Sequence, residues 1–566
     1  MNFDLMPIHS ETLVLIGAGA TASLGMPPTD DQTKIFRSLS DDKKTVEAKN
    51  VLKKYFSEKD LLKLDAFLSF LDGKADNYFL ISDSDLENAR IVFGETIATG
   101  VLQNRILELR SEYDWNALKK IIKVCPHNER SDNLIRDVYS IIDRRILSHQ
   151  SLKVNCQDKS DNDNYSLHEE ILSQSRLHSA RNFLTLFVNM LFAGAWYKIS
   201  QDEKSDVFEK YKKFINSFDL LMQKEGKQFF QQKKNVHHRS FYLFSTSFVS
   251  FNFEMVFPWI FMNSHYELNH HPTYIQDHPL KLWLDYGVEH RGRKIEGDRI
   301  EPTLEFTESV ASRENEDDHI GTPLNRAGKF YFAHGSSNWR ECPVCGRMTF
   351  FHGNNHWGDY KSIKLIPSFP IPLFEVDKID ESEFTQQENI WRKKLKYDSF
   401  QCMHCGSETK ALDSPMIMQT MYKSTPTSFL EEIQRNVKVS LEKARHIVLL
   451  GYRLPPDDTI WQHAFAEGVR SRKETDNAAF CTVVVGHKGE ERWIYSDELD
   501  SYINDYKNKG DGYGVDAIEN AIAIFDRKNV RAWTGGIPQV FGSCTEKDVK
   551  DLFYPDFVKW DGTRLK

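Results

Sequence analysis

A glycine-rich turn near the start of the chain has the residue types and spacing to bind a phosphate group. Leu13 to Ile16 form a wholly apolar run, typical of a buried parallel strand, and the run stops at Gly17-Ala18-Gly19-Ala20-Thr21. Because Gly17 and Gly19 have no Cβ atom, the backbone there can turn sharply and approach a diphosphate, while the amides of the next helical turn point at its charge. The same kind of turn also closes strands that bind no ligand.

Four of the eight cysteines form two C-x-x-C-G pairs, Cys342 with Cys345 and Cys402 with Cys405. Each pair can present two thiolates to one tetrahedral zinc ion, and the glycine that follows lets backbone amides turn toward the sulfurs. Four thiolates leave no open coordination position, so we expect a structural zinc site. The pairs are further apart than the usual spacing of about fifteen to twenty residues, which predicts a looped-out insertion between them. A vestigial site and a redox pair are the alternatives.

Two further positions end apolar runs and have side chains suited to acid–base chemistry. Asn252 and Glu254 follow one run, and His334 follows the run KFYFA. An imidazole with an ordinary pKa of about 6.5 is suited to accept a proton near neutral pH. Each position also has a structural interpretation, because asparagine caps turns well and a lone histidine at a strand end is more often structural.

Composition excludes several classes of function. The 566 residues carry a net charge of −9, so no global positive field draws the protein onto nucleic acid or an anionic membrane. There is no positively charged start followed by an apolar signal stretch, and no run of about eighteen apolar residues that would span a bilayer. Eight cysteines are too sparse for a disulfide scaffold. The sequence therefore predicts a soluble, cytoplasmic protein of about two to four domains.

Hydrophobic periodicity predicts the elements that must position these residues. Apolar residues recur three and four apart over residues 29–150 and 176–229, which indicates helices that bury one face. Residues 148–169 are polar and charged enough to form an exposed or mobile loop, and residues 258–318 are expected to be irregular with exposed loops. Later apolar runs at 446–450, 480–486 and 530–533 predict buried strands, joined through helices into a parallel sheet with right-handed crossovers.

The order of these motifs resembles the sirtuin family. The opening turn, followed by Gly25-Met26-Pro27, is similar to the sirtuin pattern GAGxS…GIP, and Thr21 keeps the hydroxyl. The segment with Asn252 and Glu254 resembles the sirtuin Q-N-x-D segment, and more closely the T-x-N-Y-D version of divergent sirtuin-like proteins. AHGSSNW, which contains His334, resembles the L-H-G-S-x-N-W of those divergent proteins, and in sirtuins a zinc ribbon follows at a similarly short distance.

The resemblance continues after the ribbon but departs at informative positions. Gly451-Tyr452 open the segment GYRLPPDD, which resembles the G-Y-S-L-P-P-x-D loop of divergent sirtuin-like proteins, with Arg453 in place of serine. Ser250 precedes the position where a glutamine would signal a deacylase. Pro28-Thr29-Asp30 replace the Asp-Phe-Arg of deacylases, whose phenylalanine covers the reactive face of the ribose. The resemblance covers residues 10–35 and 240–545 and leaves the helical block between them unaccounted for.

The resemblance implies an α/β fold with a sirtuin-type, Rossmann-like parallel sheet, a large helical insertion and a zinc-ribbon insertion. The implied segments are 1–35 for the first part of the NAD-binding domain, 36–238 for the helical insertion, 239–340 for the continuation with the catalytic Asn and His, 341–412 for the zinc ribbon with its long inserted loop, and 413–566 for the C-terminal part of the NAD-binding domain.

It also implies NAD as the substrate and a structural zinc ion. Asn252 would position a water molecule or a ribose hydroxyl, His334 would act as general base, and Glu254 would recognise the carboxamide. The other implied NAD-binding residues are Gly17, Ala18, Gly19, Ala20, Thr21, Pro27, Gly451 and Tyr452, and the implied metal ligands are Cys342, Cys345, Cys402 and Cys405.

Because the phenylalanine shield is missing, we expect water to reach the ribose cation that forms when nicotinamide leaves. The expected function is an NAD glycohydrolase that releases nicotinamide and ADP-ribose, similar to the NAD-depleting sirtuin-like proteins of bacterial antiphage defence. The alternatives are a protein deacylase or ADP-ribosyltransferase, and a non-catalytic nucleotide-sensing scaffold. The expected partners are NAD, a phage-derived activator or a partner ATPase, and further copies of the chain in a homo-oligomer, with no membrane and no direct nucleic-acid binding.

Overall fold

The computed structural model describes most of the chain, with gaps, and statements about structure below refer to the described residues. These are residues 12–40, 45–73, 79–125, 134–159, 165–202, 205–232, 246–270, 282–285, 290–296, 299–306, 326–350, 365–374, 397–402, 405–418, 420, 427–455, 458–472, 475, 477–485, 491–508 and 514–553.

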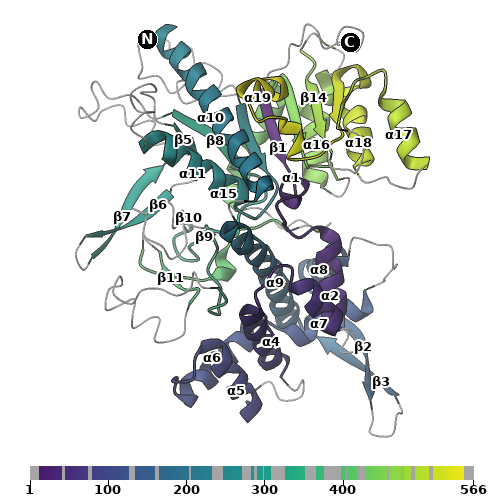
Figure 1. Ribbon diagram of the computed structural model, residues 1–566. Coiled ribbons are helices and arrows are strands. Elements are labelled where there is room, and N and C mark those ends of the chain that lie inside the picture. Colours follow the sequence, from purple (N-terminus) through teal and green to yellow (C-terminus); the bar gives the residue numbers. More distant parts are fainter. Residues whose placement is uncertain are drawn as a thin grey trace.

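Eight strands form the central sheet, in the order β15-β16-β14-β13-β1-β4-β8-β5. Every neighbouring pair is parallel except β15 with β16, which is antiparallel. The sheet and the helices around it confirm the prediction of a Rossmann-like α/β fold in its general form (Figure 1). The strands are β1 (Thr12–Ile16), β4 (Thr246–Ser250), β5 (Leu282–Asp285), β8 (Arg326–Phe332), β13 (His446–Leu450), β14 (Phe480–Val484), β15 (Trp493–Ile494) and β16 (Val530–Trp533).

The register of the central strands brings their carboxyl ends to one edge. Ile16 of β1 lies opposite Ser250 of β4 and Leu450 of β13, and Ser250 lies opposite Phe332 of β8. The chain order changes direction at β1, because the sheet first grows through β4 to β8 and later through β13 on the other side. In open α/β sheets, ligands bind outside the carboxyl ends of the strands at such a reversal.

Helices cover the sheet and bury its apolar strands. Leu13, Val14 and Leu15 of β1 have no exposed surface, as expected for a strand covered on both faces. The helices associated with the sheet are α1 (Gly19–Ala22), α10 (Asp206–Gln232), α11 (Val256–His270), α15 (Ser428–Lys443), α16 (Thr459–Gly468), α17 (Leu499–Asn508), α18 (Val515–Phe525) and α19 (Glu546–Phe553). Short 3-10 helices lie at Ala411–Asp413, Arg470–Arg472, Arg527–Asn529 and Gln539–Phe541.

Residues 29–201, between β1 and β4, form most of the predicted helical block and are drawn below the sheet in Figure 1. Four of its helices begin at a side chain that accepts from a backbone amide: Ser57, Asp114 and Ser173 are N-caps, and Ser82 forms a capping box with Asp85. The helices of this block are α2 (Thr29–Leu39), α3 (Thr45–Leu52), α4 (Glu58–Asp72), α5 (Asp83–Phe93), α6 (Thr99–Glu112), α7 (Trp115–Val124), α8 (Leu134–Leu147) and α9 (Gln174–Gln201).

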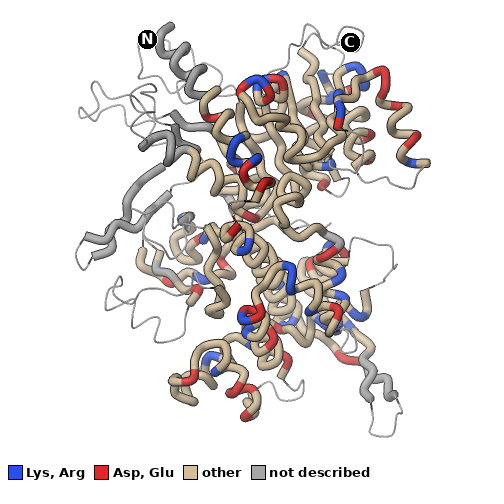
Figure 2. The backbone as a smooth tube through the Cα atoms, in the orientation of Figure 1, with Lys and Arg blue, Asp and Glu red and all other residues tan. Residues whose placement is uncertain are grey.

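Helix α9 is the longest helix of the helical block and is largely buried. By length and composition it is apolar enough to cross a membrane, which the sequence reading did not anticipate. However, 72% of its most apolar window is buried inside the protein, as in the core helix of a soluble protein. Acidic and basic residues are interspersed along the described backbone (Figure 2).

Two segments are more regular than their polar composition predicted. Residues 148–169, predicted as a loop, contribute to an antiparallel hairpin of β2 (Leu152–Lys159) and β3 (Tyr165–Leu172). Leu152, Val154 and Leu172 are buried while Lys153 faces solvent, which is the alternation of a strand with one buried face.

The stretch 258–318, predicted to be irregular, also contains regular elements. It begins inside α11, which tolerates Pro258 because the first helical turn has no intrahelical partner for that amide. It then contributes β5 and an antiparallel hairpin of β6 (His290–Glu296) and β7 (Arg299–Phe306).

His446 in the first position of β13 gives the fold a pH dependence. It has no exposed surface, its Nε2 lies 2.8 Å from Thr482 Oγ1, and its Nδ1 lies 3.1 Å from the carbonyl oxygen of Phe553. Burial, together with the nearby Arg531 cation, lowers the pKa of His446 to about 3. The folded protein therefore keeps this ring neutral across the range in which an unfolded chain protonates it.

We predict that this histidine destabilises the protein in mild acid. Below about pH 6.5 the unfolded chain binds a proton that the folded chain does not. The free energy of unfolding therefore decreases as the pH is lowered, down to about pH 3. Between pH 7 and pH 5 the loss is about 2 kcal/mol. Urea unfolding at the two pH values should show that His446→Gln has a smaller loss than the wild type, whereas His463→Gln, at an exposed site, keeps it. Equal losses in all three proteins contradict the prediction.

Candidate site at the carboxyl edge of the sheet

The loops that follow β1 and β13 are in direct backbone contact at the carboxyl edge. The amide of Gly17 donates to the carbonyl of Leu450 (3.0 Å), and the amide of Gly19 donates to the carbonyl of Gly451 (3.1 Å). A Cβ atom on Gly17 would lie 2.6 Å from the Gly451 oxygen, and one on Gly451 would lie 2.1 Å from the Ala20 nitrogen. Gly451 also has a φ of +64°. These glycines are therefore required by the contact between the two loops.

This contact changes how the glycine-rich turn must be interpreted. The amide of Ala20 donates to the carbonyl of Gly17 (2.9 Å), so the N–H groups of Gly17, Gly19 and Ala20 all have protein acceptors. The carbonyl of Ala20 accepts from the hydroxyl of Tyr211 on α10 (2.6 Å), which ties the turn to the helix that precedes β4. A diphosphate at this turn thus has fewer amides available in this conformation than the sequence pattern suggested.

Asn252, Glu254 and Thr21 form a buried hydrogen-bond network just beyond the ends of β4 and β1. The Asn252 amide nitrogen donates to Glu254 Oε1 (2.9 Å) and to the carbonyl of Gly17 (3.1 Å). The Thr21 hydroxyl donates to the same carboxyl oxygen (3.1 Å), and the Val256 amide donates to the other one (2.7 Å). Burial raises the pKa of Glu254, and these three donors oppose that shift. The network holds one carboxyl group and one carboxamide in fixed orientations.

His334 lies just past the end of β8, in an aromatic and acidic environment. The indole N–H of Trp461 donates to His334 Nε2 (3.3 Å), and Asp458 Oδ2 lies 3.3 Å from the same nitrogen. Phe251 packs edge-on against the imidazole, with ring centroids 5.2 Å apart, and stacks on Tyr452 at 4.2 Å. The Asp458 carboxylate can therefore stabilise the imidazolium that forms when His334 accepts a proton.

A cavity of about 60 Å³ lies beside the Asn252 network. We call it the Asn252 cavity, and it is lined by Ala18, Thr21, Met26, Pro27, Gln32, Ile135, Tyr139, Val188, Phe192, Phe251, Asn252, Phe253, Glu254 and Met418. It brings together five of the residues predicted from the sequence, and its other walls come largely from the helical block. His334, Gly451 and Tyr452 do not line it, but His334 packs against Phe251, which does.

Several residues of the site were not predicted from the sequence. Asp458 was read only as part of the GYRLPPDD motif, and neither it nor Trp461 received a role; the neighbouring Pro456 and Asp457 lie outside the described residues. Tyr139 and Phe192 come from helices that no motif connects to the sheet. The proximity of Trp461 to the GYRLPPDD segment was the one available signal.

The four predicted cysteines come together in a separate cluster. Cys342 Sγ lies 3.5 Å from Cys405 Sγ, Cys345 Sγ lies 3.6 Å from Cys402 Sγ, and all four sulfurs lie within 4.8 Å of one another. Zinc–sulfur bonds of about 2.3 Å in a tetrahedron give sulfur separations of this size. This cluster can hold a metal ion such as zinc. Antiparallel hairpins carry the pairs: β9 (Trp339–Glu341) with β10 (Met348–Phe350), and β11 (Phe400–Gln401) with β12 (Glu408–Thr409).

Each C-x-x-C-G turn has the backbone geometry that its glycine permits. The amides of Gly346 and Gly406 donate back to the carbonyls of Cys342 and Cys402, at 2.9 and 2.8 Å. Both glycines have positive φ angles, of 66° and 73°.

The fold and these two sites define a Rossmann-like α/β protein with a polar site at the carboxyl edge of the sheet and a four-cysteine cluster. No protein-family model matches the chain, and a search of curated proteins found no relative that matches it. The function therefore has to be argued from the residues of the site.

We predict that Gly451→Ala disrupts the contact between the two loops. The added Cβ would clash with the backbone at Ala20 and would also force alanine into a positive φ, so we expect a loss of at least about 2 kcal/mol in unfolding free energy. Gly94→Ala is the matched control, because Gly94 also has a positive φ but no atom within 4 Å of the added Cβ. Both losses of unfolding free energy are measured by urea unfolding. If Gly451→Ala loses no more than Gly94→Ala, the backbone strain of a positive φ explains the effect and the predicted clash with Ala20 is wrong.

We also predict that the purified protein contains about one zinc ion per chain, held by four thiolates. Elemental analysis should show that Cys402→Ser lowers the zinc content, and thermal unfolding should show a lower Tm. Cys125→Ser removes a buried cysteine far from the cluster in sequence and should leave the zinc content unchanged. The prediction is contradicted if wild-type protein that was purified without chelator contains no bound metal.

Proposed function

We propose that the protein hydrolyses NAD to nicotinamide and ADP-ribose. The observation that carries the proposal is the fixed Asn252–Glu254 pair beside a cavity at the carboxyl edge, with His334 packed against Phe251 of the cavity lining. Such a site offers a carboxyl group, a carboxamide and a proton acceptor at the place where α/β sheets bind nucleotides. The resemblance to divergent sirtuin-like proteins supports the same reaction.

Each residue has a role that its contacts support. Glu254, whose pKa is raised by burial, would hydrogen-bond the carboxamide of the nicotinamide ring. Asn252 would position the attacking water or a ribose hydroxyl, since its amide is already fixed by two hydrogen bonds. His334 would accept the proton from that nucleophile, and Asp458 would stabilise the resulting imidazolium.

Water would be the nucleophile because no phenylalanine follows Gly25-Met26-Pro27 at the position where deacylases carry one. Pro28 stands first in the segment where deacylases carry Asp-Phe-Arg. A cation left uncovered on that side is open to the solvent that enters the site. Release of ADP-ribose in a cell would deplete NAD, which suits a role in antiphage defence with a regulated, oligomeric form of the protein and an activator or ATPase partner.

The helical block would control access to this site. The Asn252 cavity, at about 60 Å³, is smaller than the 300 Å³ or more that small-molecule sites commonly have. Tyr139 of α8 and Phe192 of α9 line it, so binding of a dinucleotide requires these helices to move away from the sheet. The four-cysteine cluster would hold zinc as a structural ion, away from the reaction.

The test is to incubate the purified protein with NAD and to measure nicotinamide and ADP-ribose over time. We expect His334→Ala to lower the rate by about 100-fold or more, because general-base catalysis contributes that much. His463→Ala, at an exposed position on α16, is the matched control and should keep the wild-type rate.

Each other outcome has a defined meaning. Turnover only in the presence of an acylated peptide would replace hydrolysis by deacylation. Saturable NAD binding with no turnover in any protein would support a nucleotide-sensing scaffold. Equal turnover in wild type and His334→Ala would remove His334 from the mechanism.

A further inference from the structure

The residues between the two cysteine pairs pack against the helical block. We call residues 346–401 the insertion. Its described residues are 346–350, 365–374 and 397–401. The ring of Phe374 lies 5.6 Å from that of Tyr197 on α9, and the ring of Tyr397 stacks on Phe93 of α5 at 6.1 Å. The insertion therefore contacts the helical block at two separate helices.

Ion pairs join a third helix, α6, to the chain on both sides of the second cysteine pair. Before this pair, Asp398 Oδ1 lies 3.4 Å from Arg105 Nη2 on α6, and the two side chains are only 2% and 3% exposed. After the pair, Lys410 Nζ pairs with Glu112 and lies 3.4 Å from Glu108, both on α6. One helix of the block thus holds the second cysteine hairpin at two points.

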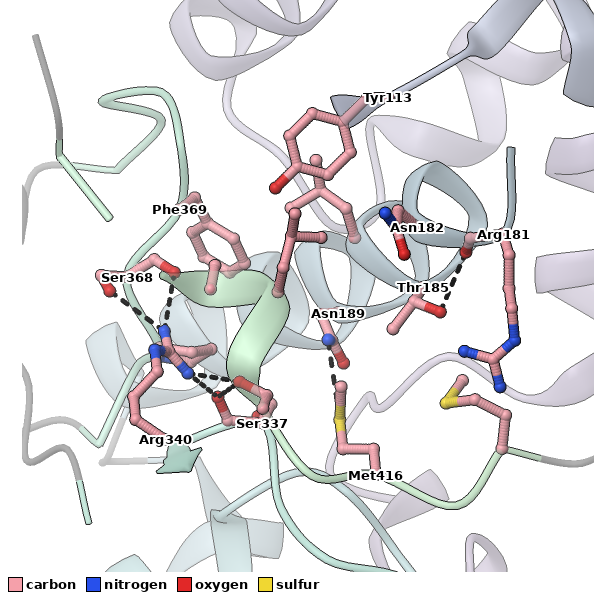
Figure 3. A pocket seen from close by; sticks show the side chains of 16 residues that line it. Tyr113, Arg181, Asn182, Thr185, Asn189, Ser337, Arg340, Ser368, Phe369 and Met416 are labelled. Carbon is pink, nitrogen blue, oxygen red and sulfur yellow. Dashed lines mark hydrogen bonds between the residues drawn. The ribbon is translucent and has the colours of Figure 1, made fainter. Parts of the chain in front are cut away.

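The first described part of the insertion is tied to the sheet domain by Arg340 of β9. This side chain donates to the Ser337 carbonyl at 3.1 Å and to the Ser368 hydroxyl at 3.2 Å (Figure 3). A cavity of about 70 Å³ lies between this segment and α9, with Phe369 on one side and Asn182 on the other (Figure 3). Because packing is incomplete there, attachment of the block depends more on the contacts with α6 and on the aromatic pairs.

The four-cysteine cluster fixes the position of the hairpin that carries these charges. Strands β11 and β12 have two residues each, and an isolated hairpin, even a longer one, is marginally stable at best in water. Cys402 at the end of β11 has its Sγ 3.6 Å from that of Cys345, in the other cysteine pair. A metal ion bound by all four thiolates joins the two hairpins, so binding of the metal is coupled to their folding.

We propose that metal binding at the cysteine cluster controls attachment of the helical block to the insertion. Without the metal the second hairpin loses its position, and Asp398 and Lys410 separate from α6. Arg105 cannot then stay buried, because a buried charge that loses its buried partner is strongly unfavourable. Its other partner, Glu108 at 2.9 Å, is 30% exposed and does not replace the buried carboxylate. Helix α6 therefore opens to solvent together with the insertion.

The effect of the metal reaches the Asn252 cavity through α9. Helix α6 packs against α9, and Tyr197 of α9 contacts Phe374 of the insertion. Phe192 of the same helix lines the Asn252 cavity. Loss of the metal would therefore let α9 move away from this cavity and would raise the rate of NAD turnover. This regulatory part rests on the proposed NAD hydrolysis, whereas the coupling of metal binding to attachment of the block does not.

Hydrogen exchange of the full chain, without NAD, tests the coupling. Protein that contains about one zinc ion per chain is compared with protein from which a chelator has removed the metal. We expect the amides of α6 to exchange at least about tenfold faster after removal, because the helix opens more often. Helix α18, which packs against β14 and β16 of the sheet, is the internal control and should keep its exchange rate.

Two variants on α6 test the reciprocal effect on zinc affinity, measured by competition with a chromophoric chelator. If the metal favours attachment, attachment favours the metal by the same factor. Arg105→Gln should weaken zinc binding by about tenfold, the value of one hydrogen bond to a charged group. Glu112→Gln should weaken it less, because its pair with Lys410 is partly exposed. Arg144→Gln, at an exposed position on α8, is the control and should keep the wild-type affinity.

Three results overturn the proposal: faster exchange only within residues 339–413, equally faster exchange in α6 and α18, or wild-type zinc affinity in both α6 variants. The second result would mean that the metal holds the whole fold and not the block. If the coupling is found but NAD is not hydrolysed with or without the metal, the proposed function fails while the coupling stands. If NAD is hydrolysed and α6 does not respond to the metal, the reverse holds. Equal NAD turnover with and without the metal removes the regulatory part.

Discussion

Close contact between the Gly17–Gly19 turn and Gly451 is the constraint on which the candidate site depends. It joins the ends of β1 and β13, leaves no room for a Cβ atom on Gly17 or Gly451, and consumes amides that a phosphate would otherwise accept from. With that contact in place, the loop after β4 can direct Asn252 toward the carbonyl of Gly17. The polar network is thus built on backbone positions that side-chain substitution cannot easily move.

The helical block is part of the site as well as an addition to the sheet. Tyr139 of α8 and Phe192 of α9 line the cavity beside Asn252. Opposite this, Arg181 of the same block faces the segment after His334. These helices therefore contact the Asn252 network directly, which gives movements of the block a direct route to its polar residues.

The sequence allowed the sheet and the cysteine cluster to be predicted because their signals are local. Apolar runs that end in glycine or a polar residue mark buried strands, and C-x-x-C-G fixes two ligands within one hairpin. The hairpin of β2 and β3 was missed because consecutive charged residues, such as Glu169 and Glu170, interrupt the alternation that marks a strand. The roles of Asp458, Trp461 and Tyr139 could not be predicted, since they depend on how distant helices pack. Glycines attributed to ligand binding turned out to be needed for packing between loops.

The order of strands in the sheet has a consequence for biosynthesis. β1 is made first but lies in the middle of the sheet, and its neighbour β13 follows about 430 residues later. At a translation rate of about 5–20 residues per second, β1 waits roughly 20 to 90 s for that partner. During this time an apolar strand has an unpaired edge, a state prone to aggregation. The helical block, which is complete much earlier and follows β1 directly, is well placed to shield that strand on the ribosome until the C-terminal strands arrive.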